Sequence, residues 1–159
     1  MLAFAPILGD LGNIGQMDKS LFRDGRKQVG QNEEADLLAR AIGLHQAGYL
    51  GEAEALYRQI LARDKNHFEA LHFLGLLEAQ RGHFAESHRL FSQTVKLNPR
   101  SLETHTNLGN VLQSLNRHEE ALASYDKALS INPSYVLALN NRGACLAVLK
   151  RFQEAVVSY

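Results

Sequence analysis

Residues Leu108–Pro133 read LGNVLQSLNRHEEALASYDKALSINP. This stretch carries Leu-Gly at its start, Ala121 in the middle, Tyr125 four residues later and Pro133 at its end. Nearly the same order occurs 34 positions earlier, with Ser87 in the place of Ala121 and Phe91 in that of Tyr125, and it begins again 34 positions later. A period of this length indicates an array of similar helical units, which bury a continuous core only by stacking on one another.

Alignment on Leu-Gly and Pro gives four frames, residues 34–67, 68–101, 102–135 and 136–159, of which the last is incomplete. The first frame is looser, with Ala41 in the glycine place and Lys65 in the proline place. The structural positions that recur in register are Gly75, Gly109 and Gly143; Ala53, Ala121 and Ala155; Tyr57, Phe91 and Tyr125; and Pro99 and Pro133.

Apolar residues within each frame follow steps of three and four, which is typical of amphipathic helices. We expect Gly109 and Ala121 to let two helices approach closely, while Tyr125 fills the wedge toward the next frame. Ser101, Ser134 and Asn32 are the predicted N-caps. The predicted helices span residues 33–46, 51–63, 67–80, 84–96, 101–114, 118–130, 135–148 and 152–159.

Over about residues 32–159 the pattern resembles the tetratricopeptide repeat (TPR) family, including bacterial multi-TPR proteins and the TPR arms of O-GlcNAc-transferase-like glycosyltransferases. The resemblance implies an all-α fold: a right-handed superhelical solenoid of antiparallel helix pairs, with three full repeats, a partial fourth and a concave groove. Residues 32–159 would form the TPR domain. Residues 1–31, which do not fit the period, are predicted to be an irregular N-terminal segment, although residues 17–28 allow a short helix.

Composition restricts the kind of partner. Lys plus Arg and Asp plus Glu both number 17, so the formal net charge is zero, which argues against nucleic acid and against a membrane surface as main partners. No apolar run reaches the length of a membrane span. A single cysteine, Cys145, excludes an internal disulfide and fits a reducing compartment, so we expect a cytoplasmic protein.

The sequence offers no catalytic or metal-binding set. The histidines have neither the spacing of paired ligands on one helix nor a shared place in the frame, so we expect no metal and no cofactor. Cys145 lies within a predicted helix and is interpreted as a small buried residue rather than a nucleophile. Without a nucleophile, a base and an orienting group together, we do not expect an enzyme. The seven histidines are His45, His67, His72, His83, His88, His105 and His118.

Asparagine forms the one polar pattern that favours ligand binding. The resemblance implies that the first helix of each repeat lines the groove, where Asn107, Asn110, Asn140 and Asn141 would offer donors and acceptors to an extended peptide, beside Phe73. The alternative is that asparagine is merely tolerated at exposed helical positions. A carboxylate clamp does not fit, because Glu103 would repel a carboxylate.

Two functions remain open at this point. The first is a protein–protein interaction module that binds an extended peptide or a partner helix in the concave groove. The second is a piece of a larger protein, the substrate-recruiting TPR arm of a bacterial glycosyltransferase.

The sequence also suggests weak self-association. It stops within the second helix of the fourth frame, without a polar capping helix, so stripe residues would be left to meet a further repeat. We expect a weak homo-oligomer, formed end to end or through docking of the Gly-rich N-terminal segment. The stripe residues concerned are Leu146, Leu149, Val156 and Tyr159.

Overall fold

The structure is a computed structural model that describes the backbone of residues 19–158 and the side chains of residues 33–158. Within this range the chain is all-α, without a strand, as predicted. The right-handed sense of the superhelix stays a prediction. The helices are α1 (Lys19–Gln46), α2 (Leu50–Arg63), α3 (Phe68–Gln80), α4 (Phe84–Leu97), α5 (Leu102–Ser114), α6 (His118–Ile131), α7 (Val136–Val148) and α8 (Phe152–Ser158).

The bounds of α2 to α8 agree with the predicted ranges to within one residue at the described ends, but α1 does not. It begins at Lys19, so residues 19–31 are helical and the prediction of an irregular segment is wrong for them, although the short helix allowed within residues 17–28 agrees with the structure over residues 19–28. Gly25 and Gly30 lower helix propensity by about 1 kcal/mol each, but a helix that continues into a packed repeat tolerates this cost. The prediction for residues 1–18 lies outside the described residues.

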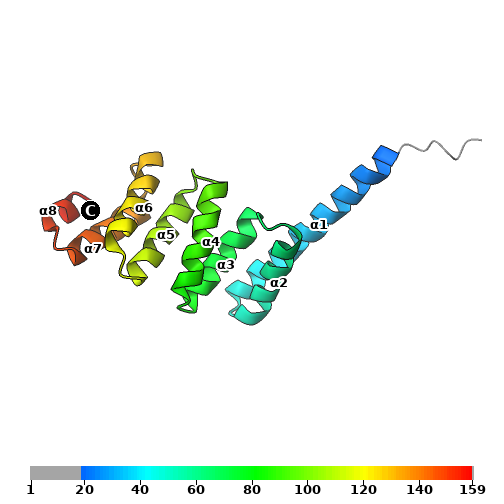
Figure 1. Cartoon of the computed structure of the whole chain (residues 1–159), viewed down its shortest axis with the longest axis horizontal. Helices are drawn as coiled ribbons and strands as arrows, with labels where there is room; N and C mark the ends of the chain where they lie inside the picture. The colour runs from blue at the N-terminus through cyan, green and yellow to red at the C-terminus, as the bar shows by residue number, and fades with distance from the viewer. Residues whose placement is uncertain (1–18, 159) are drawn as a thin grey trace, which may run out of the picture. The chain divides into compact units, whose positions relative to one another are not determined.

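The chain divides into two units between Ala35 and Asp36, and the second unit, Asp36–Tyr159, contains the stacked helices. Figure 1 shows α2 to α8 following one another in chain order within this unit. Each of these helices packs on the next, and α3 also contacts α5, as α5 contacts α7. The domain boundary predicted between residues 31 and 32 stays a prediction. No helix within residues 19–158 combines the length and apolarity needed to cross a membrane.

The two helices of a repeat are in close contact where a glycine of the first helix faces an aromatic ring of the second. A Cβ atom built on Gly109 would lie 2.7 Å from Cζ and 2.8 Å from Cδ1 of Tyr125, and one on Gly75 would lie 3.0 Å from Cε1 of Phe91. Both rings are fully buried. Gly143 is also buried, but its aromatic counterpart, Tyr159, lies outside the described residues.

The stacked helices bury two apolar clusters, one around Tyr57 and Leu74 and one around Tyr125 and Leu146. Leu146 is 0% exposed, so the prediction that its side chain is left uncovered for contact with a further repeat is wrong. Its frame position is that of Leu112, which also packs inside its own array. Leu149 is partly buried against the same cluster, whereas Val156 is 74% exposed. Ala53, Ala121 and Ala155 are all buried.

The turn inside each repeat contains one residue with positive φ, at intervals of 34 positions. Gly48 and Gly82 have φ of 85° and 80°, and Asn116 and Lys150 have φ of 58° and 61°. Glycine adopts this left-handed conformation without a steric cost, and asparagine tolerates it better than other residues. Lys150 therefore occupies the least favourable of the four turns.

The turn between repeats is closed by a side chain at a second recurring position. Asp64, Asn98 and Asn132 each accept a hydrogen bond at Oδ1 from the backbone N–H two residues later, at 2.9 to 3.1 Å. These turns follow α2, α4 and α6, and Pro99 and Pro133 lie within the last two of them. Proline cannot continue a helix interior, so it reinforces the stop.

The predicted N-caps have mixed outcomes. Ser101 caps α5, with its Oγ accepting from the Thr104 N–H at 3.2 Å, as predicted. Ser134 is not the cap of α7, because that position is taken by Tyr135 and the Ser134 hydroxyl bonds to Asn132 instead. Asn32 lies inside α1, since the helix begins earlier than the apolar period does.

Candidate protein-interaction surface

The first helices of the repeats, α1 from Asp36 onward, α3, α5 and α7, form one side of the stack. Contacts of α3 with α5 and of α5 with α7 mean that these helices approach one another across the intervening second helices. Helices on the inside of a curved stack lie closest together, so these contacts indicate that the first helices lie on the inner side. We refer to this side as the first-helix face. The candidate residues Phe73, Asn107, Asn110, Asn140 and Asn141 all belong to these helices.

An open hollow of about 480 Å³ lies on this face between α1 and α3. Phe73 is partly buried in its wall, and its ring stacks on Tyr57 with centroids 6.1 Å apart. His45 bridges the two helices, with Nε2 3.1 Å from Gln80 Oε1 and Nδ1 3.4 Å from the Tyr57 hydroxyl. The hollow thus combines an apolar wall with a polar rim. It is lined by Ile42, His45, Gln46, Phe73, Leu76 and Gln80.

The structure brings two of the four asparagines together. Asn141 on α7 donates from Nδ2 to Asn110 Oδ1 on α5 at 2.8 Å, which joins the third and fourth repeats. The buried Tyr125 hydroxyl lies 2.8 Å from the same oxygen and 2.6 Å from Gln113 Oε1, and it donates its single hydrogen to one of them. Burial raises the pKa of Tyr125 well above its usual range, so the hydroxyl keeps that hydrogen.

The other two asparagines are placed differently. Asn140 is exposed and Asn107 partly so, and neither side chain makes a hydrogen bond within the described part of the chain. Their amide groups remain available to a ligand, whereas Asn110 and Asn141 already serve packing between repeats. The 34-residue period does not assign a role to the Tyr125 hydroxyl, although the change from Phe91 to Tyr125 at one frame position is the signal that indicates it.

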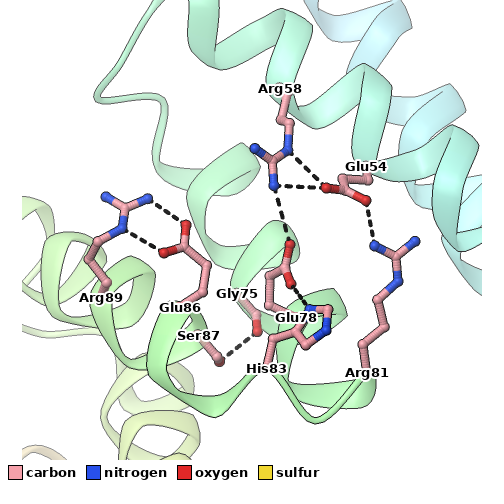
Figure 2. Close-up of polar contacts among 9 residues, drawn as sticks. All are labelled: Glu54, Arg58, Gly75, Glu78, Arg81, His83, Glu86, Ser87 and Arg89. Carbon is pink, nitrogen blue, oxygen red and sulfur yellow. Dashed lines mark hydrogen bonds and ion pairs between the residues drawn. The ribbon is translucent and has the colours of Figure 1, made fainter.

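A network of charges joins the first two repeats (Figure 2). Glu54 on α2 bonds to both Arg81 and Arg58, and Arg58 continues to Glu78 on α3 at 3.5 Å. Glu78 is 3% exposed and also bonds to His83 Nδ1 at 2.7 Å. The hydrogen bond from Arg81 is the main reason why the pKa of Glu54 lies below its ordinary value. Every carboxylate here has a cationic or histidine partner, so the network is a clamp between repeats rather than an acid–base pair.

The remaining candidate groups for chemistry serve packing. His72 is stacked near Phe68 and bonds through Nδ1 to Thr104 Oγ1 at 3.2 Å, and burial lowers its pKa. His105 Nε2 lies 3.0 Å from the Pro99 carbonyl oxygen. Cys145 is fully buried, and burial raises the pKa of its thiol. Among the side chains that the structure describes, no three His, Cys, Asp or Glu residues form a metal-type cluster.

These features are those of a helical-repeat protein built from stacked 34-residue helix pairs. Residues 102–135 match the family described as tetratricopeptide repeat, and the chain has the fold of proteins built from this repeat. No curated protein matches the sequence.

Solved structures show the same fold. A mutant O-GlcNAc transferase from Thermobaculum terrenum is 30% identical, with a TM-score of 0.67 over 71% of this chain and 22% of that chain. This chain therefore spans about a fifth of the transferase's length. A MamA structure has a TM-score of 0.75 at 21% identity, over 85% of this chain and 79% of that one. MamA from Desulfovibrio magneticus RS-1 has the same TM-score at 17% identity, over 81% of this chain and 73% of that one.

Proposed function

We propose that this protein is a non-enzymatic interaction scaffold whose first-helix face binds an extended peptide. The TPR match and the stacked-repeat fold support an interaction scaffold as the general role. The observation that carries the finer proposal is the state of Asn107 and Asn140, whose amides make no hydrogen bond within the described chain. Each amide has both donors and an acceptor, which suits the backbone of a peptide without selecting its side chains.

The hollow beside Phe73 would supply the apolar part of recognition. Its volume of about 480 Å³ exceeds that of any single side chain, and its wall is formed by Ile42, Phe73 and Leu76. Burial of one leucine-sized side chain of the peptide there would contribute about 1.5–3 kcal/mol. The amides lie on α5 and α7 and the hollow on α1 and α3, so a peptide that uses both must be extended along the face.

A peptide selected from a random display library for binding to the wild-type protein provides the test. The double variant Asn107→Ala with Asn140→Ala should weaken this peptide by about 1–3 kcal/mol per lost interaction. Gln153→Ala removes an exposed amide from α8 and is the matched control, which should leave the affinity unchanged. Selected peptides that bind the double variant as tightly as the wild type would contradict the proposal.

A second candidate role is the substrate-recruiting arm of a glycosyltransferase. The 30% identity to the O-GlcNAc transferase supports it, but this chain spans only about a fifth of that protein. Sugar transfer by the full-length gene product, measured with a radiolabelled nucleotide sugar, would separate this role from that of a scaffold without catalysis.

Weak self-association through α8 is a further proposal about partners. Val156 is 74% exposed. Leu122, which lies 34 positions earlier on α6, is only 5% exposed, because α7 packs on α6. A second molecule that covers Val156 would bury it in the same way. Sedimentation over a concentration series should show reversible association that Val156→Asp abolishes, and a strictly monomeric wild type at high concentration would refute it.

A further inference from the structure

A crevice on the opposite side of the stack, between α2 and α4, has an apolar floor. It is an open hollow of about 410 Å³, and α3 closes it from below. Its floor is formed by Leu61, Leu71, Leu74 and Leu90, of which the last three belong to the buried core. We refer to this hollow as the second-helix crevice. None of the predicted site residues lies in it.

The rim of the second-helix crevice is basic. Arg58, Lys65 and Arg89 line it against a single carboxylate, Glu86. A neighbouring hollow shares Arg89 and adds Lys96 further along α4, so the cations continue beyond the crevice.

The ion pairs on the rim leave a surplus of positive charge. Arg89 is 61% exposed and is paired with Glu86 at 2.7 Å, and Arg58 is 58% exposed and belongs to the clamp in Figure 2. Lys65 and Lys96 have no ion-pair partner within the part of the chain that the structure describes. Lys65, Lys96 and Arg89 are exposed and balance no buried charge, so they attract an anionic partner, whereas Arg58 also pairs with the buried Glu78.

The repeat itself provides an internal comparison. Positions 34 and 68 residues after the three rim cations are their equivalents in the later frames. None of these six positions is basic, so stacking of the repeats does not require cations there. The equivalents are Ser92 and Asp126 for Arg58, Pro99 and Pro133 for Lys65, and Ala123 and Val157 for Arg89.

We propose that the second-helix crevice is a second docking site, which binds an acidic peptide segment of a partner protein with an apolar side chain at its centre. The leucine floor takes the apolar side chain, and the basic rim takes the flanking carboxylates. Nucleic acid fits less well, because the lining contains no aromatic ring on which a base could stack and the chain as a whole carries no net charge. The site is separate from the first-helix face and does not depend on peptide binding there.

Fluorescence anisotropy of a labelled probe peptide tests the site. The probe has two central leucines with two glutamates on each side, and it is titrated with the full chain at low salt. The double variant Lys65→Ala with Arg89→Ala should bind it at least about tenfold more weakly, and added salt should weaken the wild type more than the variant. Arg89→Ala reproduces the alanine found at this position one repeat later, and the melting curve of the variant verifies its fold.

Two controls make the result specific. Lys127→Ala removes an exposed cation from α6, outside the crevice, and should leave the affinity unchanged. A probe whose leucines are replaced by serine should bind more weakly than the original, and a probe with lysines in place of the glutamates should not bind.

Three results would overturn the proposal. Equal affinity of the wild type and the double variant would remove the crevice from the interaction. Tighter binding of a single-stranded RNA, lost in the same variant, would assign the basic rim to nucleic acid. A dimer of the wild type that the double variant abolishes would assign the crevice to a second copy of this chain.

Discussion

Gly109→Ala tests whether the aromatic ring of one helix fixes the distance to the other. In an ordinary helix interior this change stabilises by about 1 kcal/mol, because alanine loses less backbone freedom on folding. Here the new Cβ would lie 2.7 and 2.8 Å from two ring carbons of Tyr125, well inside the usual contact distance of about 3.5 Å. The ring is fully buried and its hydroxyl is bonded to Asn110 or Gln113, so it cannot swing into solvent.

The expected net effect is destabilisation by about 1–3 kcal/mol. Overpacking of a buried site costs about 1–3 kcal/mol, and displacement of the ring adds about 1 kcal/mol for a lost hydrogen bond. The gain in helix propensity offsets about 1 kcal/mol of this total. Urea denaturation followed by far-UV circular dichroism measures the change as a lower midpoint at constant slope.

Two other glycines calibrate the result. Gly43→Ala meets nothing within 4 Å, so it should stabilise by about 1 kcal/mol. Gly75→Ala would place its Cβ 3.0 Å from Phe91, a ring without a hydroxyl to hold it, and should fall between the other two. If Gly109→Ala stabilises as much as Gly43→Ala does, the steric argument is refuted. In a Tyr125→Leu background, Gly109→Ala should lose its penalty, because the ring is gone.

Three further outcomes follow from individual residues. Lys150→Gly should raise the free energy of unfolding by about 1 kcal/mol in urea denaturation, because Lys150 has φ of 61° and glycine adopts that angle freely; an unchanged midpoint would contradict this. Burial lowers the pKa of His72 below 6.5 in the folded chain, so the unfolded chain takes up the proton first as the pH falls. The free energy of unfolding should therefore decrease as the pH drops from 6.5 toward the pKa of His72 in the folded chain. His72→Gln should show a smaller decrease in the free energy of unfolding between about pH 8 and pH 5. Cys145 is buried with a raised pKa, so a disulfide reagent should label it only as fast as the chain opens, and rapid labelling of the native protein would show that the thiol is accessible.

The 34-residue register predicted the helices of the repeats closely, because residues such as proline and glycine mark the helix ends and crossings through their own backbone chemistry. Pro99 and Pro133 end helices through the missing N–H, and Gly109 marks a crossing through its missing side chain. The start of α1 could not be predicted in the same way. Its first part lies outside the 34-residue period and contains Gly25 and Gly30, so the sequence allows only a short helix within residues 17–28 and does not predict its continuation into the first repeat.

The candidate site was predictable only in part. The register places Asn107 and Asn141 at one frame position, but it cannot indicate that Asn141 reaches Asn110 on the preceding first helix. That contact depends on how far successive repeats shift and rotate, which a one-dimensional period does not contain. The basic rim was missed for another reason. The sequence marks Lys65 only as a departure from proline, and its proximity to Arg89 depends on the packing of α2 beside α4.

The same register also separates residues that hold the stack from residues that are free to bind. Positions where the frames agree, such as Gly75 and Gly109, are explained by close contact between helices, and a change there should alter stability first. Positions where the frames differ while the side chain stays exposed, such as Arg89 and Ala123, are not required by stacking. Since each repeat contacts mainly its neighbours, substitutions at such positions should change binding while leaving the fold intact. The basic rim of the second-helix crevice consists of such positions, and on the first-helix face Asn140 is exposed and Asn107 partly so, which is the physical reason to look for two partners rather than one.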